Sequence, residues 1–141
     1  MKPKENIDSV GTVLLIENDP TAMEKSQNLL QVMGYNVLVS KTGEQALGIA
    51  NTYGKDINLA ILDVNAQDRD LLSTFSSLAK ARPSMKIIVS SQYDIDFWAK
   101  EILEAGAHGL IQKPFTSTAL SEKLKQITNA NYTSCHNCVP K

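Results

Sequence analysis

The sequence of 141 residues predicts a doubly wound α/β fold, a three-layer sandwich around a five-stranded parallel sheet. Five short apolar runs, rich in β-branched residues and continuous rather than alternating, are typical of strands buried on both faces. Amphipathic stretches with helical spacing follow each run. This fivefold β-α alternation predicts right-handed crossovers onto one sheet, and the chain is too short for a closed eight-stranded barrel.

The strands are expected at the apolar runs themselves. Each run is short and bounded by polar or glycine-containing segments, which fits a strand better than a helix. In chain order the runs are Val13–Ile16, Val37–Val39, Leu59–Leu62, Ile87–Val89 and Leu110–Ile111.

Helix boundaries are marked by residues that cap or break helices. The first helix, Pro20–Met33, stops before Gly34, which suits a C′ position. The second, Thr42–Asn51, opens on Thr42-x-x-Gln45, a capping-box pattern. These signals predict the end of the first helix and the start of the second.

The remaining three helices show a clear apolar stripe or a clear stop. The helix Leu71–Ala81 ends just before Arg82-Pro83, because a residue preceding proline leaves the α region. The helix Asp94–Ala105 carries an unbroken apolar stripe. The helix Thr116–Ile127 has Thr116 as a candidate N-cap.

Composition excludes several classes of protein. Apolar residues make up 43% and charged residues 21%, which are ordinary globular values. A formal net charge of −1 offers no electrostatic attraction for nucleic acid or an anionic membrane surface, and no apolar run could span a bilayer. A cysteine-free body and the absence of a secretory signal at the N-terminus predict a cytoplasmic protein.

Two polar segments flank the predicted sandwich. We expect an N-terminal tail over residues 1–10, one domain over 11–128 and a flexible C-terminal tail over 129–141. The tail sequence Cys135-His-Asn-Cys138 offers at most three ligands, so free thiols are favoured over a structural zinc site. His108 lies between the fourth predicted helix and the strand that precedes Lys113, and it is expected to be solvated.

Polar residues follow four of the five predicted strands. They are Glu17-Asn18-Asp19, Asp63, Ser90-Ser91 and Lys113. In a doubly wound sheet the carboxyl ends of the strands meet at one edge, where ligands bind. Clustered carboxylate oxygens select a hard cation such as Mg²⁺, and a carboxylate beside a lysine and a hydroxyl can form an aspartyl phosphate. Asp19 suits a helix cap better than a metal ligand.

The stretch Glu104-Ala-Gly-Ala-His-Gly-Leu-Ile-Gln-Lys-Pro-Phe115 is similar to the "EAGAxxYxxKPF" motif of response regulator receiver domains. Asp63 lies 46 residues after Glu17, and Lys113 lies 22 after Ser91, spacings that also fit this family. The chain resembles a receiver from about Thr12 to Ile127, which implies a flavodoxin-like, CheY-like fold.

The resemblance implies a phosphoacceptor and a metal site. Asp63 would be the phosphoacceptor. Glu17 and Asn18 would hold Mg²⁺ together with Asp63 and the backbone carbonyl of Asn65. The usual acidic pair is Asp-Asp, so a neutral Asn18 predicts weakened Mg²⁺ binding.

The resemblance also implies a switch. Ser91 would be the hydroxyl that turns toward the phosphoryl group, and Lys113 the family's lysine, with a cis bond to Pro114. Leu110 stands where the family often has an aromatic residue that couples to this hydroxyl. Phe97 lies off the apolar stripe of its helix and is a candidate docking residue.

The short stretch after the last predicted helix leads us to expect a stand-alone receiver. The resemblance implies that it takes a phosphoryl group from a sensor histidine kinase or a histidine phosphotransfer protein. It would act on an unknown downstream protein through contacts, and would not be an enzyme beyond slow self-dephosphorylation. The loop after Asp63 departs from the family, with Gln67 for a proline and Leu71 for a glycine. Two alternatives stay open: a pseudo-receiver that binds partners without phosphorylation, and a flavodoxin-type flavin or nucleotide binder.

Overall fold

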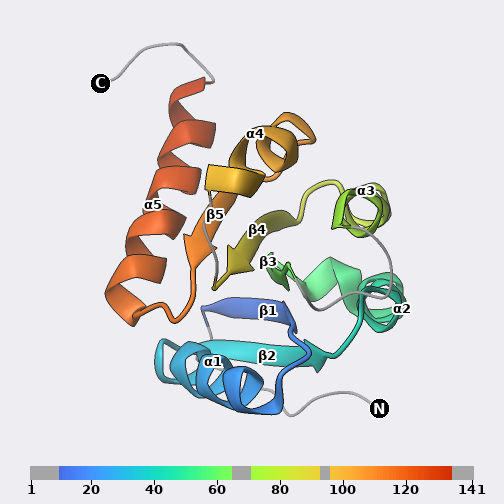
Figure 1. The fold of residues 1–141 in the computed structure, drawn as a ribbon, viewed down its shortest axis with the longest axis vertical. Coiled ribbons are helices and arrows are strands. Elements are labelled where there is room, and N and C mark those ends of the chain that lie inside the picture. Colours follow the sequence, from blue (N-terminus) through green and yellow to red (C-terminus); the bar gives the residue numbers. More distant parts are fainter. Residues whose placement is uncertain (1–9, 65–70, 93–95, 135–141) are drawn as a thin grey trace.

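The computed structural model describes residues 10–64, 71–92 and 96–134, and the side chains within these ranges except those of 96–99 and 128–134. A five-stranded parallel sheet with the order β2-β1-β3-β4-β5 forms the middle layer (Figure 1). Every predicted apolar run lies within one of its strands, so the predicted fold class is confirmed. The strands are β1 (Gly11–Ile16), β2 (Tyr35–Ser40), β3 (Leu59–Asp63), β4 (Lys86–Ser91) and β5 (Gly109–Gln112).

Helices cover both faces of the sheet, as the alternating sequence predicts. The helices α1 and α5 lie on one side of the sheet in Figure 1, and α2, α3 and α4 lie on the other. Their bounds are α1 (Pro20–Val32), α2 (Gly43–Tyr53), α3 (Leu71–Ala81), α4 (Asp96–Glu104) and α5 (Ser117–Ser134), with a short 3₁₀ helix η1 (Gly54–Asp56) after α2.

The predicted capping residues start the helices α2 and α5. The Thr42 hydroxyl accepts a hydrogen bond from the Gln45 backbone N–H at 3.1 Å, and the Gln45 side chain accepts one from the backbone N–H of Lys41 at 2.8 Å. Thr116 caps α5 by accepting from the Ala119 N–H at 3.0 Å. These bonds satisfy N–H groups that a helix leaves without a partner at its start.

One helix end differs clearly from its prediction, and the predicted start of another helix falls outside the described residues. The helix α4 begins at Asp96, and residues 93–95, which include the predicted start at Asp94, lie outside the described residues. The helix α5 continues to Ser134, past the predicted end at Ile127. The sequence after Ile127 is polar and carries no apolar stripe, and such a segment shows no helical period even when it continues a helix.

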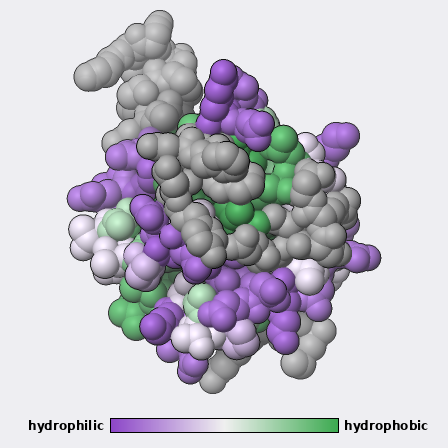
Figure 2. Space-filling view, in the orientation of Figure 1, coloured by the Kyte–Doolittle hydropathy of each residue, from purple (hydrophilic) through white to green (hydrophobic). Residues whose placement is uncertain are grey.

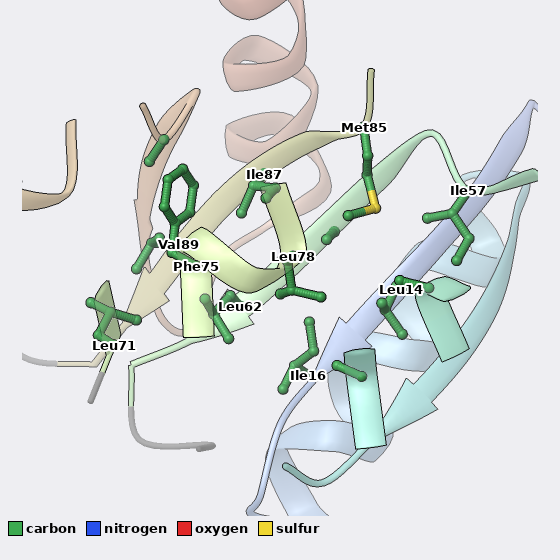
Figure 3. Packing of buried hydrophobic residues seen from close by; sticks show 14 of the residues in the cluster. Leu14, Ile16, Ile57, Leu62, Leu71, Phe75, Leu78, Met85, Ile87 and Val89 are labelled. Carbon is green, nitrogen blue, oxygen red and sulfur yellow. The ribbon is translucent and has the colours of Figure 1, made fainter. Parts of the chain in front are cut away.

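Two hydrophobic clusters separate the sheet from the two helix layers. One packs β1, β3 and β4 against α2, α3 and α4, and Figure 3 shows Phe75 and Leu78 of α3 directed at Leu62, Ile87 and Val89 of the sheet. The other packs the opposite face against Leu30 of α1 and Leu120 of α5. All of β3 is buried, which fixes the central strand that carries Asp63 at its end.

The face seen in Figure 2 is mainly hydrophilic, with hydrophobic residues gathered between α3 and α4. Within the described ranges, no helix combines the length and the apolar character needed to cross a membrane.

His108 is held by the backbone rather than left to solvent, so the expectation of a solvated side chain is wrong. Its Nδ1 accepts a hydrogen bond from the Ile87 N–H at 3.0 Å, and its backbone N–H donates to the Ile87 carbonyl at 2.9 Å. Burial, together with the charge of Lys86, lowers the pKa of His108 below its ordinary value. Only an unprotonated Nδ1 can accept this bond.

His108 should therefore make stability fall on mild acidification. Because its pKa is lower in the folded chain, the unfolded chain binds the proton first, and the contribution present above about pH 6.5 is lost as the pH falls through the folded value. His108→Gln does not titrate, so its free energy of unfolding should change less between about pH 7 and pH 5. Urea unfolding across this range measures the difference, and equal slopes for both proteins would refute the assignment.

Candidate functional site

The sheet register brings the polar strand ends together. Ile16, Leu62 and Val89 lie side by side across β1, β3 and β4. Glu17 and Asp63 are the next residues along the chain after Ile16 and Leu62, and Asp63 lies opposite Ser90. Lys113 directly follows β5, and its N–H donates to the carbonyl of Ser91 at 2.8 Å. The structure thus places the predicted residues at one edge of the sheet.

Lys113 bridges two buried carboxylates. Its Nζ lies 2.7 Å from Oδ1 of Asp63 and 2.8 Å from Oε1 of Glu17. The side chains of Glu17 and Asp63 are each 3% exposed, and that of Lys113 is 10% exposed. A buried carboxylate needs such a partner, because the cost of removing it from water is several kcal/mol otherwise.

The two carboxylates keep Lys113 charged. Burial alone would lower the pKa of Lys113, but hydrogen bonds and the charges of Asp63 and Glu17 outweigh it, so the pKa lies above its ordinary value. One ammonium group between two carboxylates leaves this part of the site with one net negative charge. A further cation, or a group that carries one, is therefore attracted to it.

The three residues after β1 differ in burial and in their contacts. Glu17 is buried, whereas Asn18 and Asp19 are exposed. Oδ2 of Asp19 accepts a hydrogen bond from the Ala22 N–H at 2.8 Å and caps α1, as the sequence predicts. The Asp19 N–H in turn lies 3.3 Å from Oε2 of Glu17. Asp19 thus caps the helix, whereas Asn18 follows the buried Glu17 in the chain and is exposed.

The donor set fits a hard divalent cation, although it is short of charge. Glu17 and Asp63 offer carboxylate oxygens and Asn18 an amide oxygen, which are the kinds of ligand that Mg²⁺ prefers. Among the described residues no group of three His, Cys, Asp or Glu side chains is arranged to hold a metal. Asn65, whose backbone carbonyl is a predicted ligand, lies outside the described residues, as does Gln67.

The switch residues are placed less completely. Ser90 and Ser91 are both buried, and Ser91 is one residue nearer the edge of the sheet that carries Lys113. Leu110 is half-buried and packs against the cluster on the α2–α3–α4 side. The lysine–proline bond Lys113-Pro114 is cis, as the resemblance implies. The side chain of Phe97 lies outside the described residues, as do Cys135 and Cys138.

A hollow beside Lys113 was not predicted from the sequence. It has a volume of about 390 Å³ and lies between one side of α1 and the loop after β5. Its walls include Ser26 and Leu29 from α1 and Pro114 and Phe115 from the loop. The apolar stripe of α1 predicts a buried face for Leu29, but the period of a stripe does not show where a neighbouring loop leaves it uncovered.

The α/β sandwich has a CheY-like fold. An acid, a hydroxyl and a lysine lie at the carboxyl edge of its sheet. The response regulator receiver domain family matches residues 13–125, and the chain belongs to this family. Receivers take part in phosphorelay signalling and typically bind Mg²⁺. The family match favours the receiver prediction over a flavin or nucleotide binder.

Curated relatives are longer proteins that contain a similar segment. The sensor kinase CckA of Brucella abortus is 28% identical over 117 residues, which cover 83% of this chain and 12% of the kinase. The transcriptional regulatory protein CpxR of Escherichia coli is 27% identical over 126 residues, or 89% of this chain and 52% of the regulator. The chain thus spans about half or less of these relatives.

Solved structures show the same fold. A CheY-like receiver from Methanospirillum hungatei superposes with a TM-score of 0.76 at 25% identity, over 89% of this chain and 99% of that one. A response regulator from Burkholderia pseudomallei superposes with a TM-score of 0.75 at 18% identity, over 88% and 72% of the two chains. That second structure carries a phosphorylated aspartic acid, a calcium ion and citrate.

Proposed function

We propose that the protein is a phosphorylatable receiver in which Asp63 accepts a phosphoryl group from a phosphohistidine. The donor is a sensor histidine kinase or a histidine phosphotransfer protein. The observation that carries this proposal is the buried contact of 2.7 Å between Oδ1 of Asp63 and Nζ of Lys113. A nucleophilic carboxylate beside a fixed ammonium group is what phosphoryl transfer needs.

The transfer is an in-line displacement at phosphorus. A carboxylate oxygen of Asp63 forms the new O–P bond while the P–N bond to the donor imidazole breaks, and the imidazole leaves with the electron pair of that bond. Lys113 balances the negative charge on the phosphoryl oxygens, and the Ser91 hydroxyl donates a hydrogen bond to one of them. Mg²⁺ held by Glu17, Asn18, Asp63 and the Asn65 carbonyl, with weakened affinity, would supply further charge neutralisation.

Phosphorylation shifts the population of conformations of the face formed by β4, α4, β5 and α5. Phosphorylation replaces the single negative charge of the Asp63 carboxylate with about two on the phosphoryl group, next to Lys113 and Ser91, which lie at the ends of β5 and β4. Leu110 stands where the family often has an aromatic residue. Its side chain has no polar group, so it couples the phosphorylation site to this face through apolar packing. A downstream protein reads the altered face through contacts, and slow hydrolysis of the acyl phosphate by the receiver itself resets it.

Treatment with a small phosphodonor tests this function. Intact-mass spectrometry of the wild-type protein with acetyl phosphate and Mg²⁺ should show one added phosphoryl group, in larger amount as Mg²⁺ is raised. No adduct at any Mg²⁺ concentration would favour the second candidate, a pseudo-receiver that binds partners without phosphorylation. The neutral, exposed Asn18 in the metal set is the feature that favours that candidate.

The hollow beside Lys113 is proposed as the docking place of the phosphohistidine protein. It adjoins the buried Lys113–Asp63 pair, and Leu29 and Phe115 give it apolar walls of the kind that a partner helix covers. A donor seated there brings its imidazole to the edge of the sheet, where Asp63 lies.

Ser26→Arg should slow phosphoryl transfer from a protein donor but not from the small molecule acetyl phosphate. Ser26 is half-buried in the wall of the hollow, so a long charged side chain there obstructs a protein partner but leaves Asp63 unchanged. Phosphoryl transfer from a phosphohistidine protein should slow about tenfold, while the rate with acetyl phosphate stays the same. Asn28→Arg, at an exposed position of the same helix, is the matched control. Equal rates of transfer from the phosphohistidine protein to Ser26→Arg and Asn28→Arg would show that the donor does not dock in this hollow.

A further inference from the structure

A second hollow lies between α2 and the end of β2, and no residue of the phosphorylation site lines it. Its volume is about 620 Å³. The helix α2 lies on the opposite side of the molecule from α5 (Figure 1), and β2 is an edge strand of the sheet. Val39 of β2 is 38% exposed beside the hollow, although its side chain is apolar. The walls are formed by Val39, Gln45, Gly48, Ile49, Thr52 and Tyr53.

Gly48 is a glycine that the fold of one chain does not require. It lies in the middle of α2 and is exposed. Apart from its own helix, no atom of the described residues lies within 4 Å of a Cβ placed on Gly48. Alanine would fit there and is the better helix former. A residue without a side chain on an exposed helix face does, however, let a second helix approach closely.

Two opposite charges flank Gly48 along the helix. Glu44 lies in the first turn of α2, and Lys55 lies in η1, which directly follows α2. They are 11 residues apart, which is about three helical turns, so they lie on nearly the same side. Both are exposed, and neither has an ion pair within the ranges that the structure describes.

This order of charges is complementary to itself. The midpoint between Glu44 and Lys55 falls next to Gly48. If a second copy of α2 crosses here in the antiparallel direction, Glu44 of each copy faces Lys55 of the other. A two-fold axis brings the same surface of both copies together, so the ion pair forms twice. Parallel helices would instead place like charges against each other.

We propose that α2 pairs with α2 of a second copy of this chain, antiparallel about a two-fold axis close to Gly48. Gly48 lets the two helices approach, and the apolar wall at Val39 becomes covered. The reciprocal pairs between Glu44 and Lys55 select the antiparallel orientation. The interface goes beyond the proposed function, because it uses none of the residues assigned to phosphoryl transfer.

Reversal of the two charges tests the orientation. Sedimentation equilibrium over a series of protein concentrations would give the dissociation constant of the dimer. Glu44→Lys and Lys55→Glu should each raise it about tenfold, because each change places like charges together twice. The double variant exchanges the charges and should lie within about twofold of the wild type.

Glu122→Lys is the matched control, because it makes the same change of charge at an exposed position of α5. Its dissociation constant should equal that of the wild type. A double variant no tighter than the single variants would overturn the proposal, as would a wild-type protein that stays monomeric up to about 1 mM.

Gly48→Ala should have opposite effects on folding and on association. In dilute, monomeric protein the midpoint of urea unfolding should rise, because alanine favours the helix and meets no neighbour. The dissociation constant of the dimer should rise about fivefold, because two added methyl groups separate the helices. A dimer that neither Gly48→Ala nor Glu44→Lys weakens would be formed through another surface, and the proposal would be wrong.

Discussion

Asp63→Asn is expected to abolish the phosphoryl adduct formed with acetyl phosphate. The amide is not a nucleophile toward phosphorus, and it has almost the same shape as the carboxylate. The variant should remain folded, because the pair between Glu17 and Lys113 at 2.8 Å survives the change. Intact-mass spectrometry under conditions that phosphorylate the wild type would measure the loss.

Asp56→Asn is the matched control for this prediction. Asp56 is an exposed acid at the end of the short helix η1, away from the strand ends, so its variant should form the adduct at the wild-type level. An adduct of undiminished amount in Asp63→Asn would mean that another residue accepts the phosphoryl group.

Lys113→Met is expected to lower the free energy of unfolding by about 3 kcal/mol. The change leaves the carboxylates of Glu17 and Asp63, each 3% exposed, without the cation that both now contact. The variant should also lose most of its phosphorylation, because no ammonium group balances the transferred charge. Urea unfolding and intact-mass spectrometry measure the two effects.

Two further variants test whether the unpaired buried charges cause the loss of stability in Lys113→Met. Lys25→Met, at an exposed position of α1, should change the free energy of unfolding by less than about 0.5 kcal/mol. Adding Asp63→Asn to Lys113→Met should recover part of the loss, since one unpaired carboxylate is removed. If the double variant were no more stable than Lys113→Met, the unpaired buried carboxylates would not be the source of the loss.

The ion pairs of Lys113 with Asp63 and Glu17 also predict that the free energy of unfolding falls at alkaline pH. The pKa of Lys113 is raised in the folded chain, so its contribution is complete below the ordinary lysine value near pH 10.4. It is lost as the pH rises through the folded value.

The fold and the position of the site could be predicted because strand ends are visible in the sequence. Apolar runs such as Leu59–Leu62 mark buried strands, and the polar residue that follows each run lies at the carboxyl edge of a parallel sheet. Asp63 and Lys113 were found in this way, and the structure brings their side chains to 2.7 Å.

Contacts that depend on side-chain reach could not be predicted. Spacing in the sequence places Glu17 near the site, but only the structure shows that its longer side chain meets Lys113 at 2.8 Å. The hydrogen bonds of His108 with Ile87 depend on the approach of two chain segments that are distant in the sequence, and no local sequence pattern predicts them. The hollow between α1 and the loop after β5 likewise depends on how two distant segments pack.

The central claim is that phosphorus is carried by the Asp63 carboxylate. Borohydride reduces an acyl phosphate of aspartate to homoserine, so reduction after phosphorylation, followed by peptide mass spectrometry, identifies the residue that carried the group. Homoserine at position 63 is the predicted result. Homoserine at any other acidic position, or none in a protein that shows the mass adduct, would contradict it.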